Sequence, residues 1–269
     1  NPQNPNIEAA KRELFICEGS DWFWWYGEPN DSGRDNIFDY IFREHLKNIY
    51  LYLGLDVPEY LETPLLSAIA KPSRYPKEEF TPIIDGKEHD DEIWLNAGCI
   101  KIPDGPVLKE NKFYDQIYFG YDKDNLYLRF YINEYLKETP ALLKQVNQMY
   151  IYMRNQDKKQ ALSPIRIIQK TESILPISKE KFHNELQISI FGGEINLVRL
   201  VKAIPNNLWV ITTSKDIKTA YDKVVDVAIP FDTIDISSGD TLEFLFVNAN
   251  YGVKDYFVPN EMLLTITRM

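Results

Sequence analysis

The sequence has few of the residues that build metal centres and nucleophilic sites. Its 269 residues include three histidines and two cysteines. His45, His89 and His183 stand far apart, and neither Cys17 nor Cys99 has a neighbour at metal-ligand spacing. A histidine-rich metal site, a Ser-His-Asp triad and a disulfide framework are therefore not predicted. Both cysteines are expected to be reduced and buried, as small hydrophobic side chains.

Positive charge and long apolar runs are also scarce. Forty acidic residues against thirty basic ones give a formal net charge of −10. That charge repels phosphate backbones and anionic lipid, so no nucleic-acid or membrane-surface partner is predicted. No apolar run approaches the ~20 residues that cross a bilayer, so no membrane insertion is expected. Residues 1–5 contain neither a basic region nor an apolar run, so no signal peptide is predicted in this chain. The sequence does not distinguish a cytoplasmic from an extracellular location.

Aromatic side chains, in contrast, are plentiful. The chain has 17 Tyr, 14 Phe and 5 Trp, a mixture that suits β-sheets and stacking surfaces. Hydrophobic residues make up 44% of the sequence, which is enough for a soluble protein to bury a core.

The first part of the chain predicts helices. Apolar residues recur at helical spacing from Ile7 to Cys17 and again from Ile37 to Leu53, and Gly54 supplies a C-terminal stop. Two helices cannot bury both apolar stripes against each other alone. They are expected to dock on the rest of the chain or on a domain outside it.

The pattern changes after a proline-rich stretch. Four prolines between Pro64 and Pro82 punctuate a charged segment and predict a linker. We place a helical segment at residues 1–68, the linker at 69–80 and a second domain at 81–269.

In the second domain the hydrophobic period falls from 3.6 to 2. Leu126, Leu128 and Phe130 alternate with Tyr127 and Arg129, which is typical of a half-buried antiparallel strand. About ten such runs are separated by turn signals. The predicted fold class is therefore mainly β, with a short N-terminal helical segment followed by an antiparallel β-sandwich.

The strongest local signal lies between Glu18 and Gly27. Five aromatic residues follow one another from Trp22 to Tyr26, and a helix would spread them around its axis. Some of them must therefore be exposed or meet another domain. Indole faces stack well on the apolar faces of sugar rings, whereas the alternative is a helix end packed against a neighbouring domain.

This stretch resembles a known family. The pattern Ala-x-x-Glu-Leu-x-x-x-Glu-Gly-Ser-Asp-Trp-Phe-Trp-Trp-Tyr-Gly from Ala10, followed by Phe38-Asp39, Phe42-Arg43, His45-Leu46 and Tyr50-x-x-Leu53-Gly54, is similar to the helical segment after the catalytic barrel of glycoside hydrolase family 57. The resemblance covers about residues 7 to 65. It implies substrate-side roles for Asp21 and Trp22, which would border the active-site cleft.

The same resemblance implies that this chain holds no catalytic residue. In that family the nucleophilic Glu and the acid Asp lie on barrel strands that precede this segment, and no such strands precede Asn1 here. An N-terminal catalytic barrel outside the chain is therefore an expected partner.

A second resemblance covers about residues 81 to 269. It rests on short motifs that are similar to carbohydrate-binding module family 9 and to the C-terminal module of glucodextranase. These motifs are Ile84-Asp85-Gly86, Glu92-Ile93-Trp94-Leu95-Asn96-Ala97, Tyr118-Phe119-Gly120-Tyr121-Asp122, Leu126-Tyr127-Leu128 and Val227-Ala228-Ile229-Pro230-Phe231. The resemblance implies a carbohydrate-binding type of sandwich.

The candidate site residues follow from these observations. Trp94 and Trp209 are either sugar platforms or buried strand tryptophans. The full predicted substrate-binding set is Asp21, Trp22, Trp24, Trp25, Tyr26, Trp94 and Trp209, with no catalytic and no metal-binding residue. No cofactor is predicted, although calcium is an alternative because Asp90-Asp91, Asp122-Asp124 and Asp232-Asp235 offer carboxylates. Such turn residues also cap their own backbone.

We therefore predict the non-catalytic C-terminal portion of an α-glucan-processing glycoside hydrolase, which supports the active-site border and binds an α-glucan or other oligosaccharide. The alternative is a structural or cell-surface anchoring module without a sugar site. Exposed aromatic residues in a row on one sandwich face would favour binding, and a polar face without such a row would favour the anchor.

Overall fold

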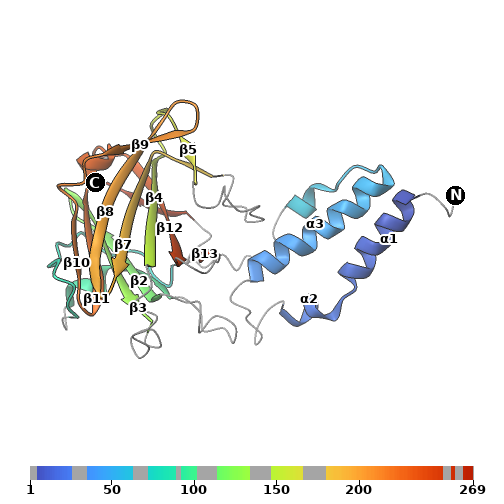
Figure 1. Ribbon diagram of the computed structural model, residues 1–269, viewed down its shortest axis with the longest axis horizontal. Helices are drawn as coiled ribbons and strands as arrows, with labels where there is room; N and C mark the ends of the chain where they lie inside the picture. Colours follow the sequence, from blue (N-terminus) through green and yellow to red (C-terminus); the bar gives the residue numbers. More distant parts are fainter. Residues whose placement is uncertain are drawn as a thin grey trace. The chain divides into compact units, whose positions relative to one another are not determined.

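The computed structural model describes residues 5–25, 35–62, 72–88, 92–101, 114–133, 147–165, 180–250, 256–257 and 263–268. It separates into two compact units, of which one holds the helices within Asn1–Ile69 and the other holds the strands (Figure 1). The predicted class, mainly β with a short N-terminal helical segment, is confirmed. The predicted boundary at residues 69–80 stays a prediction.

The helical unit contains α1 (Pro5–Cys17), α2 (Ser20–Trp25), α3 (Asp35–Leu53) and the 3-10 turn η1 (Glu59–Glu62). A buried ion pair joins Arg43 to Asp39 at 2.9 Å, and the same guanidinium donates to the Leu61 carbonyl at 2.9 Å. This pair ties η1 back onto α3. Gly54 ends α3 in the left-handed region, at φ 69°.

The strand unit contains two antiparallel sheets. The first has the order β1 (Gly98–Lys101), β2 (Tyr114–Tyr121), β3 (Asn125–Ile132), β11 (Val224–Pro230) and β10 (Lys218–Tyr221). The second has the order β13 (Tyr256–Phe257), β12 (Thr241–Asn250), β4 (Asn147–Asn155), β7 (Asn184–Phe191), β8 (Glu194–Ile204) and β9 (Leu208–Thr212), with β14 (Leu264–Thr267) also beside β12. Two short strands, β5 (Ser163–Pro164) and β6 (Lys181–Phe182), form a separate ribbon. The turns η2 (Glu92–Asn96) and η5 (Phe231–Ile234) complete this unit.

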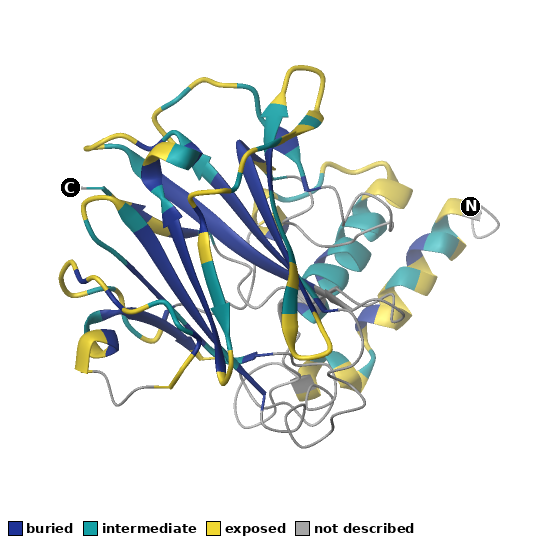
Figure 2. Cartoon of the chain, turned by 60° about the vertical axis from the view of Figure 1, so that its left-hand side comes forward, coloured by how far each residue is buried: buried dark blue, intermediate teal, exposed yellow. Residues whose placement is uncertain are grey.

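The core lies between the inner faces of these two sheets. Ring pairs cross from one sheet to the other, Phe119 to Phe244 at 5.7 Å and Phe130 to Phe246 at 5.2 Å between centroids. Figure 2 shows most strands in the colour of buried residues over most of their length. The period-two pattern of the sequence thus produces a β-sandwich with one continuous hydrophobic core.

Residues 72–88 and 92–97 cover the outer face of the first sheet. Ser73 N–H donates to the Cys99 carbonyl at 2.7 Å, and Phe80 N–H donates to the Tyr121 carbonyl at 3.0 Å. The Phe80 ring lies over Gly120, where an added Cβ would come within 2.1 Å of a ring carbon. The described part of the predicted linker therefore lies along the sheet, and its burial requires a glycine at position 120.

A charged pair is buried beneath this cover. Arg129 donates to both carboxylate oxygens of Asp226, at 2.7 and 3.0 Å, and neither residue is exposed. Asp226 also accepts the Gly86 N–H at 3.0 Å. The guanidinium carbon lies 4.5 Å from the centre of the Trp94 ring, so the pair connects β3, β11 and the covering segment.

Candidate functional site

The outer face of the second sheet carries aromatic and polar side chains together. On β4, the inward residues Met149, Ile151 and Met153 belong to the core. The alternate residues Gln148, Tyr150, Tyr152 and Arg154 lie on the opposite face, because successive strand residues point to opposite sides. This outer face of β12, β4, β7, β8 and β9 is the candidate site.

The strand register arranges these residues in rows across the sheet. Tyr150 is opposite Gln187 of β7 and Val247 of β12. In the next row Tyr152 is opposite Glu185 and Leu245. Direct cross-strand neighbours lie close enough to touch, so each row combines a ring with a hydrogen-bonding side chain.

Four rings are gathered on this face. The Tyr150 and Tyr152 rings are nearly parallel, with 14° between their planes and 6.4 Å between centroids. Tyr152 also contacts Phe182 at 5.4 Å and Trp209 at 6.4 Å. Trp209 Nε1 donates to the Pro164 carbonyl at 3.2 Å, which fixes the indole relative to β5.

Hydrogen bonds hold the polar side chains of this face in place. The Tyr150 hydroxyl donates to Gln148 Oε1 and accepts a bond from Gln187 Nε2 at 3.4 Å. Arg154 of β4 lies opposite Glu243 of β12 and forms an ion pair with it. Burial alone would lower the pKa of Arg154, but the bonds to Glu243 and Glu180 outweigh it and raise that pKa. Arg154 therefore stays charged.

Burial divides the face into a centre and a rim. The centre is buried and includes the rings of Tyr150, Tyr152 and Phe182 and the polar residues Glu185, Gln187 and Ser189. The buried Ser189 hydroxyl has no hydrogen-bond partner among the described residues. Arg154 and Trp209 are partly exposed. Buried polar groups cost free energy unless they are bonded, so this arrangement exceeds what packing alone requires. Its chemistry suits a neutral polar ligand with apolar ring faces.

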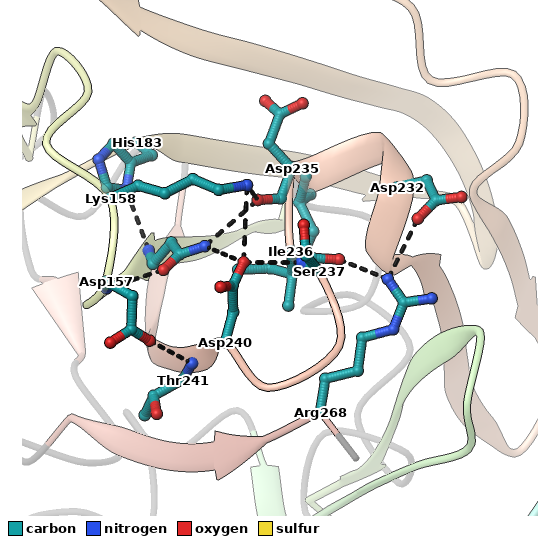
Figure 3. Close-up of polar contacts among 12 residues, drawn as sticks. Asp157, Lys158, His183, Asp232, Asp235, Ile236, Ser237, Asp240, Thr241 and Arg268 are labelled. Atoms are coloured by element: carbon teal, nitrogen blue, oxygen red, sulfur yellow. Dashed lines mark hydrogen bonds and ion pairs between the residues drawn. The ribbon is translucent and has the colours of Figure 1, made fainter.

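A second polar cluster lies at one end of the sandwich (Figure 3). Lys158 Nζ donates to the Asp235 carbonyl at 2.5 Å and lies 3.5 Å from an Asp240 carboxylate oxygen. Asp240 also accepts bonds from Asn155 Nδ2 and from the Ser237 N–H, both at 2.7 Å. These contacts join the loop after β4 to the turn before β12.

His183 is part of the same cluster. Its Nδ1 accepts the backbone N–H of Asn155 at 3.0 Å, so the ring is neutral in this arrangement. Burial lowers the pKa of His183, and the charge of Arg154 lowers it further.

Three of the carboxylates that offer an alternative calcium site, Asp122, Asp232 and Asp235, form hydrogen bonds or ion pairs with other groups of the protein. Asp122 Oδ1 accepts the N–H groups of Asp124 and Asn125 at 2.8 Å, as a turn residue does. Asp232 pairs with Arg268 at 3.1 Å and Asp235 with Lys202 at 2.6 Å. Across the described ranges no three His, Cys, Asp or Glu residues gather as a metal site. Asp90 and Asp91 lie outside those ranges.

The two sandwich tryptophans have different environments. Trp94 is 5% exposed and lies among Phe80, Tyr127 and Arg129 on the outer side of the first sheet. Burial at this level leaves no ring face for a ligand, so the structure does not support Trp94 as a sugar platform. Trp209 is partly exposed and lies on the candidate face.

Of the predicted substrate-binding residues in the helical unit, Trp22 packs against α3, whereas others are exposed. Trp22 packs on α3, with its ring centroid 5.6 Å from that of Phe42, and its Nε1 donates to the Ile16 carbonyl at 2.6 Å. Asp21 is exposed, and Trp24 is 62% exposed. Trp25 ends α2, but its side chain and the whole of Tyr26 lie outside the described part. The binding role of these residues stays a prediction.

Sequence reasoning missed most of the outer-face residues. The signal was present in residues 148–154, where Gln, Tyr, Tyr and Arg alternate with apolar residues. The alternation predicts a strand there, and the polar and aromatic residues of its second face are the signal for the site.

No protein-family model matches the chain, and no curated protein matches it. Two solved structures of a carbohydrate-binding module family 9 from Caldicellulosiruptor kristjanssonii are similar to it. One, in complex with cellotriose, is 14% identical over 70% of this chain and 78% of that chain, with a TM-score of 0.31. The other, in complex with glucose, is 15% identical over 63% and 74%, with a TM-score of 0.29. TM-scores of this size do not establish a common fold.

None of the described helices is long and apolar enough to span a membrane.

Proposed function

We propose that the sandwich binds gluco-oligosaccharides on the outer face of the β13–β9 sheet. The observation that carries this proposal is the partly exposed Trp209 ring of β9, which lies on the same face as the partly exposed polar side chains Gln148 and Arg154. The indole offers apolar contact to a sugar ring, and the amide and guanidinium offer bonds to its hydroxyls. The Tyr150, Tyr152 and Phe182 rings are as buried as Trp94 and serve to hold this face in place.

The compensated charges of this face and the negative net charge of the chain favour an uncharged ligand. The face combines Arg154 with Glu243 and Glu180 in ion pairs, so its positive charge is already compensated. The net charge of the chain is −10, which disfavours anionic ligands. A neutral oligosaccharide meets neither difficulty.

We further propose that the chain is the non-catalytic C-terminal portion of an α-glucan-processing glycoside hydrolase. The resemblance of residues 7–65 to the segment that follows the barrel in family 57 supports this assignment. The helical unit also exposes large apolar side chains on every helix, as expected of a segment that docks on another domain. These are Leu14, Phe15, Ile16, Phe23, Trp24, Leu51, Tyr52, Leu53, Leu55 and Tyr60.

Calorimetric titration with maltooligosaccharides and cellooligosaccharides tests the sugar proposal. The full chain should bind at least one series with an affinity that changes little with salt, because stacking and neutral hydrogen bonds are not screened. Stronger binding of the α-linked series would support the α-glucan assignment. Absence of binding to both series would refute the proposal and leave the anchoring module as the function.

Matched variants locate the site. Trp209→Ala should weaken binding about tenfold, which corresponds to about 1.4 kcal/mol of lost ring contact. Gln148→Ala should also weaken binding, because its amide is a partly exposed hydrogen-bonding group on this face. Tyr75→Ala is the control, since Tyr75 is an exposed aromatic residue on the segment that covers the first sheet. Equal loss in the control and the test variants would place the site elsewhere.

A further inference from the structure

His183 connects the polar cluster at the end of the sandwich to the candidate face. Its backbone is held on two sides, because its N–H donates to the Met153 carbonyl at 3.0 Å and its carbonyl accepts the Ala203 N–H at 2.7 Å. The residue is 6% exposed, and its Nδ1 accepts the Asn155 N–H at 3.0 Å. Since the backbone is fixed, a change of protonation acts on the surroundings through the ring.

Protonation reverses the role of this ring nitrogen. In a neutral imidazole one nitrogen accepts a hydrogen bond, whereas in the imidazolium both nitrogens are donors. Protonated His183 would therefore place one N–H donor against another, that of Asn155, across the present 3.0 Å. The hydrogen bond is lost, and the displacement falls on Asn155 and the loop after it, because both backbone groups of His183 are bonded to other strands.

Charged groups from three segments face the imidazole, and Figure 3 shows Lys158 and Asp235 in its cluster. Burial lowers the pKa of the ring most, and the charges of Arg154 on β4 and of Lys158 in the following loop lower it further. The Gln160 backbone and the Asp235 carboxylate act in the opposite direction and do not offset this. Asp235 is already paired with Lys202 of β8 at 2.6 Å. The imidazolium would thus be poorly compensated in the folded chain.

Asn155 lies between two residues that hold Glu243 on the candidate face. Arg154 Nε donates to one carboxylate oxygen of Glu243, and Gln156 Nε2 donates to the other. The Asn155 side chain is itself fixed, since its Nδ2 donates to Asp240 at 2.7 Å. A displacement of Asn155 therefore moves both donors of Glu243 and changes the position of the Arg154 guanidinium.

We propose that His183 is a proton-operated switch for the sugar site. In its neutral form it holds Asn155, and thereby Arg154, in the binding arrangement, and on protonation it releases them. This inference rests on the proposed sugar-binding function. His183 is a positioning residue, because it acts through Asn155 and not by contact with the ligand. Its pKa in the folded chain is below the ordinary 6.5, so affinity should be highest above about pH 6.5 and fall at lower pH.

Two-dimensional 15N NMR of the full chain between about pH 7.5 and pH 5.0 tests the switch without a ligand, because this range spans the titration of histidine. In the unmodified chain the Asn155 amide and Arg154 Nε–H signals should move together, with a midpoint below pH 6.5. In His183→Gln both should stay in place, because the amide oxygen of glutamine accepts the Asn155 N–H but does not titrate. His45→Gln is the matched control in the helical unit and should retain the shifts. An Asn155 amide of the unmodified chain that does not titrate would overturn the proposal, even if His183→Gln folds poorly.

Calorimetric titration with maltohexaose and cellohexaose at the same two pH values tests the regulation. The Kd of the unmodified chain should rise by up to about tenfold per pH unit below the midpoint, because apparent affinity follows the fraction of neutral ring. The Kd of His183→Gln should be equal at both pH values. Binding by the unmodified chain that is equally strong at both would overturn the regulatory role and leave the sugar site standing. If neither sugar binds at the higher pH, the proposed function fails, and the Asn155 titration still decides whether the ring moves this loop.

Discussion

Removal of Asp226 should destabilise the sandwich strongly. The Arg129 guanidinium makes two hydrogen bonds to this carboxylate, at 2.7 and 3.0 Å, in a place without solvent access. In the variant Asp226→Ala the guanidinium remains buried without its counter-charge, and the Gly86 N–H loses its acceptor. Breaking one partner of a buried ion pair costs about 3–5 kcal/mol.

The double variant gives the sharper expectation. Replacing both charges, as in Arg129→Met with Asp226→Ala, removes the uncompensated buried charge. It should therefore cost less than Asp226→Ala alone, since hydrophobic replacement of a buried pair is often nearly neutral. What remains is the lost Gly86 bond and the lost contact with the Trp94 ring.

Urea unfolding followed by Trp fluorescence measures both values. For a slope of about 2–3 kcal/mol per molar urea, the single variant should shift the unfolding midpoint by about 1–2.5 M. Trp94 emission reports the sandwich directly, because its ring lies on the guanidinium. A single variant that costs below about 1 kcal/mol, or a double variant that costs the sum of the singles, would refute the reasoning.

Four further predictions concern stability and activity. The pKa of His183 in the folded chain lies below its ordinary 6.5, so on acidification the unfolded chain binds a proton first, and stability should fall as the pH drops below about 6.5. Urea unfolding at several pH values measures this fall, which should be smaller in His183→Gln. A fragment of residues 72–269 should be more stable than one of residues 81–269, which lacks the buried Phe80 ring, by about 3–5 kcal/mol in thermal unfolding. Trp94→Ala should lower stability by a similar ~3–5 kcal/mol without any specific effect on sugar binding, as titration under folding conditions will show. The isolated chain should release no reducing sugar from amylose, because glycosidic cleavage needs two opposed carboxyl groups on rigid elements, and turnover that survives purification would contradict this.

The fold class could be predicted because strand periodicity has a direct physical cause. Leu126, Leu128 and Phe130 had to point to one side of their strand, and the structure places all three in the core. The same reasoning could not say what covers the other side. Tyr127 and Arg129 look like solvent-facing residues in the sequence, yet both are buried beneath residues 72–88 and 92–97.

The candidate site depends on contacts that a single sequence does not encode locally. Tyr152 and Trp209 are 57 positions apart, and their rings are in contact although β7 and β8 lie between their strands in the second sheet. Strand order and register determine which side chains come into contact across a sheet, and both depend on pairing between segments that are far apart in the sequence. The sequence therefore identified Trp209 as a candidate but gave no means of finding Tyr150 or Gln187 beside it.

The aromatic residues of α2 illustrate what the local sequence can and cannot predict about packing. A helix advances by about 100° per residue, so Trp22 and Trp24 lie on nearly opposite sides of its axis. At most one of the two can pack against a single neighbouring helix, and this much follows from the sequence. Which one does so depends on the side on which α3 lies. The structure places α3 beside Trp22, where Phe38, Phe42 and His45 contact the ring. Trp24 is exposed for that reason, and any ligand or domain that binds α2 has to meet it on that side.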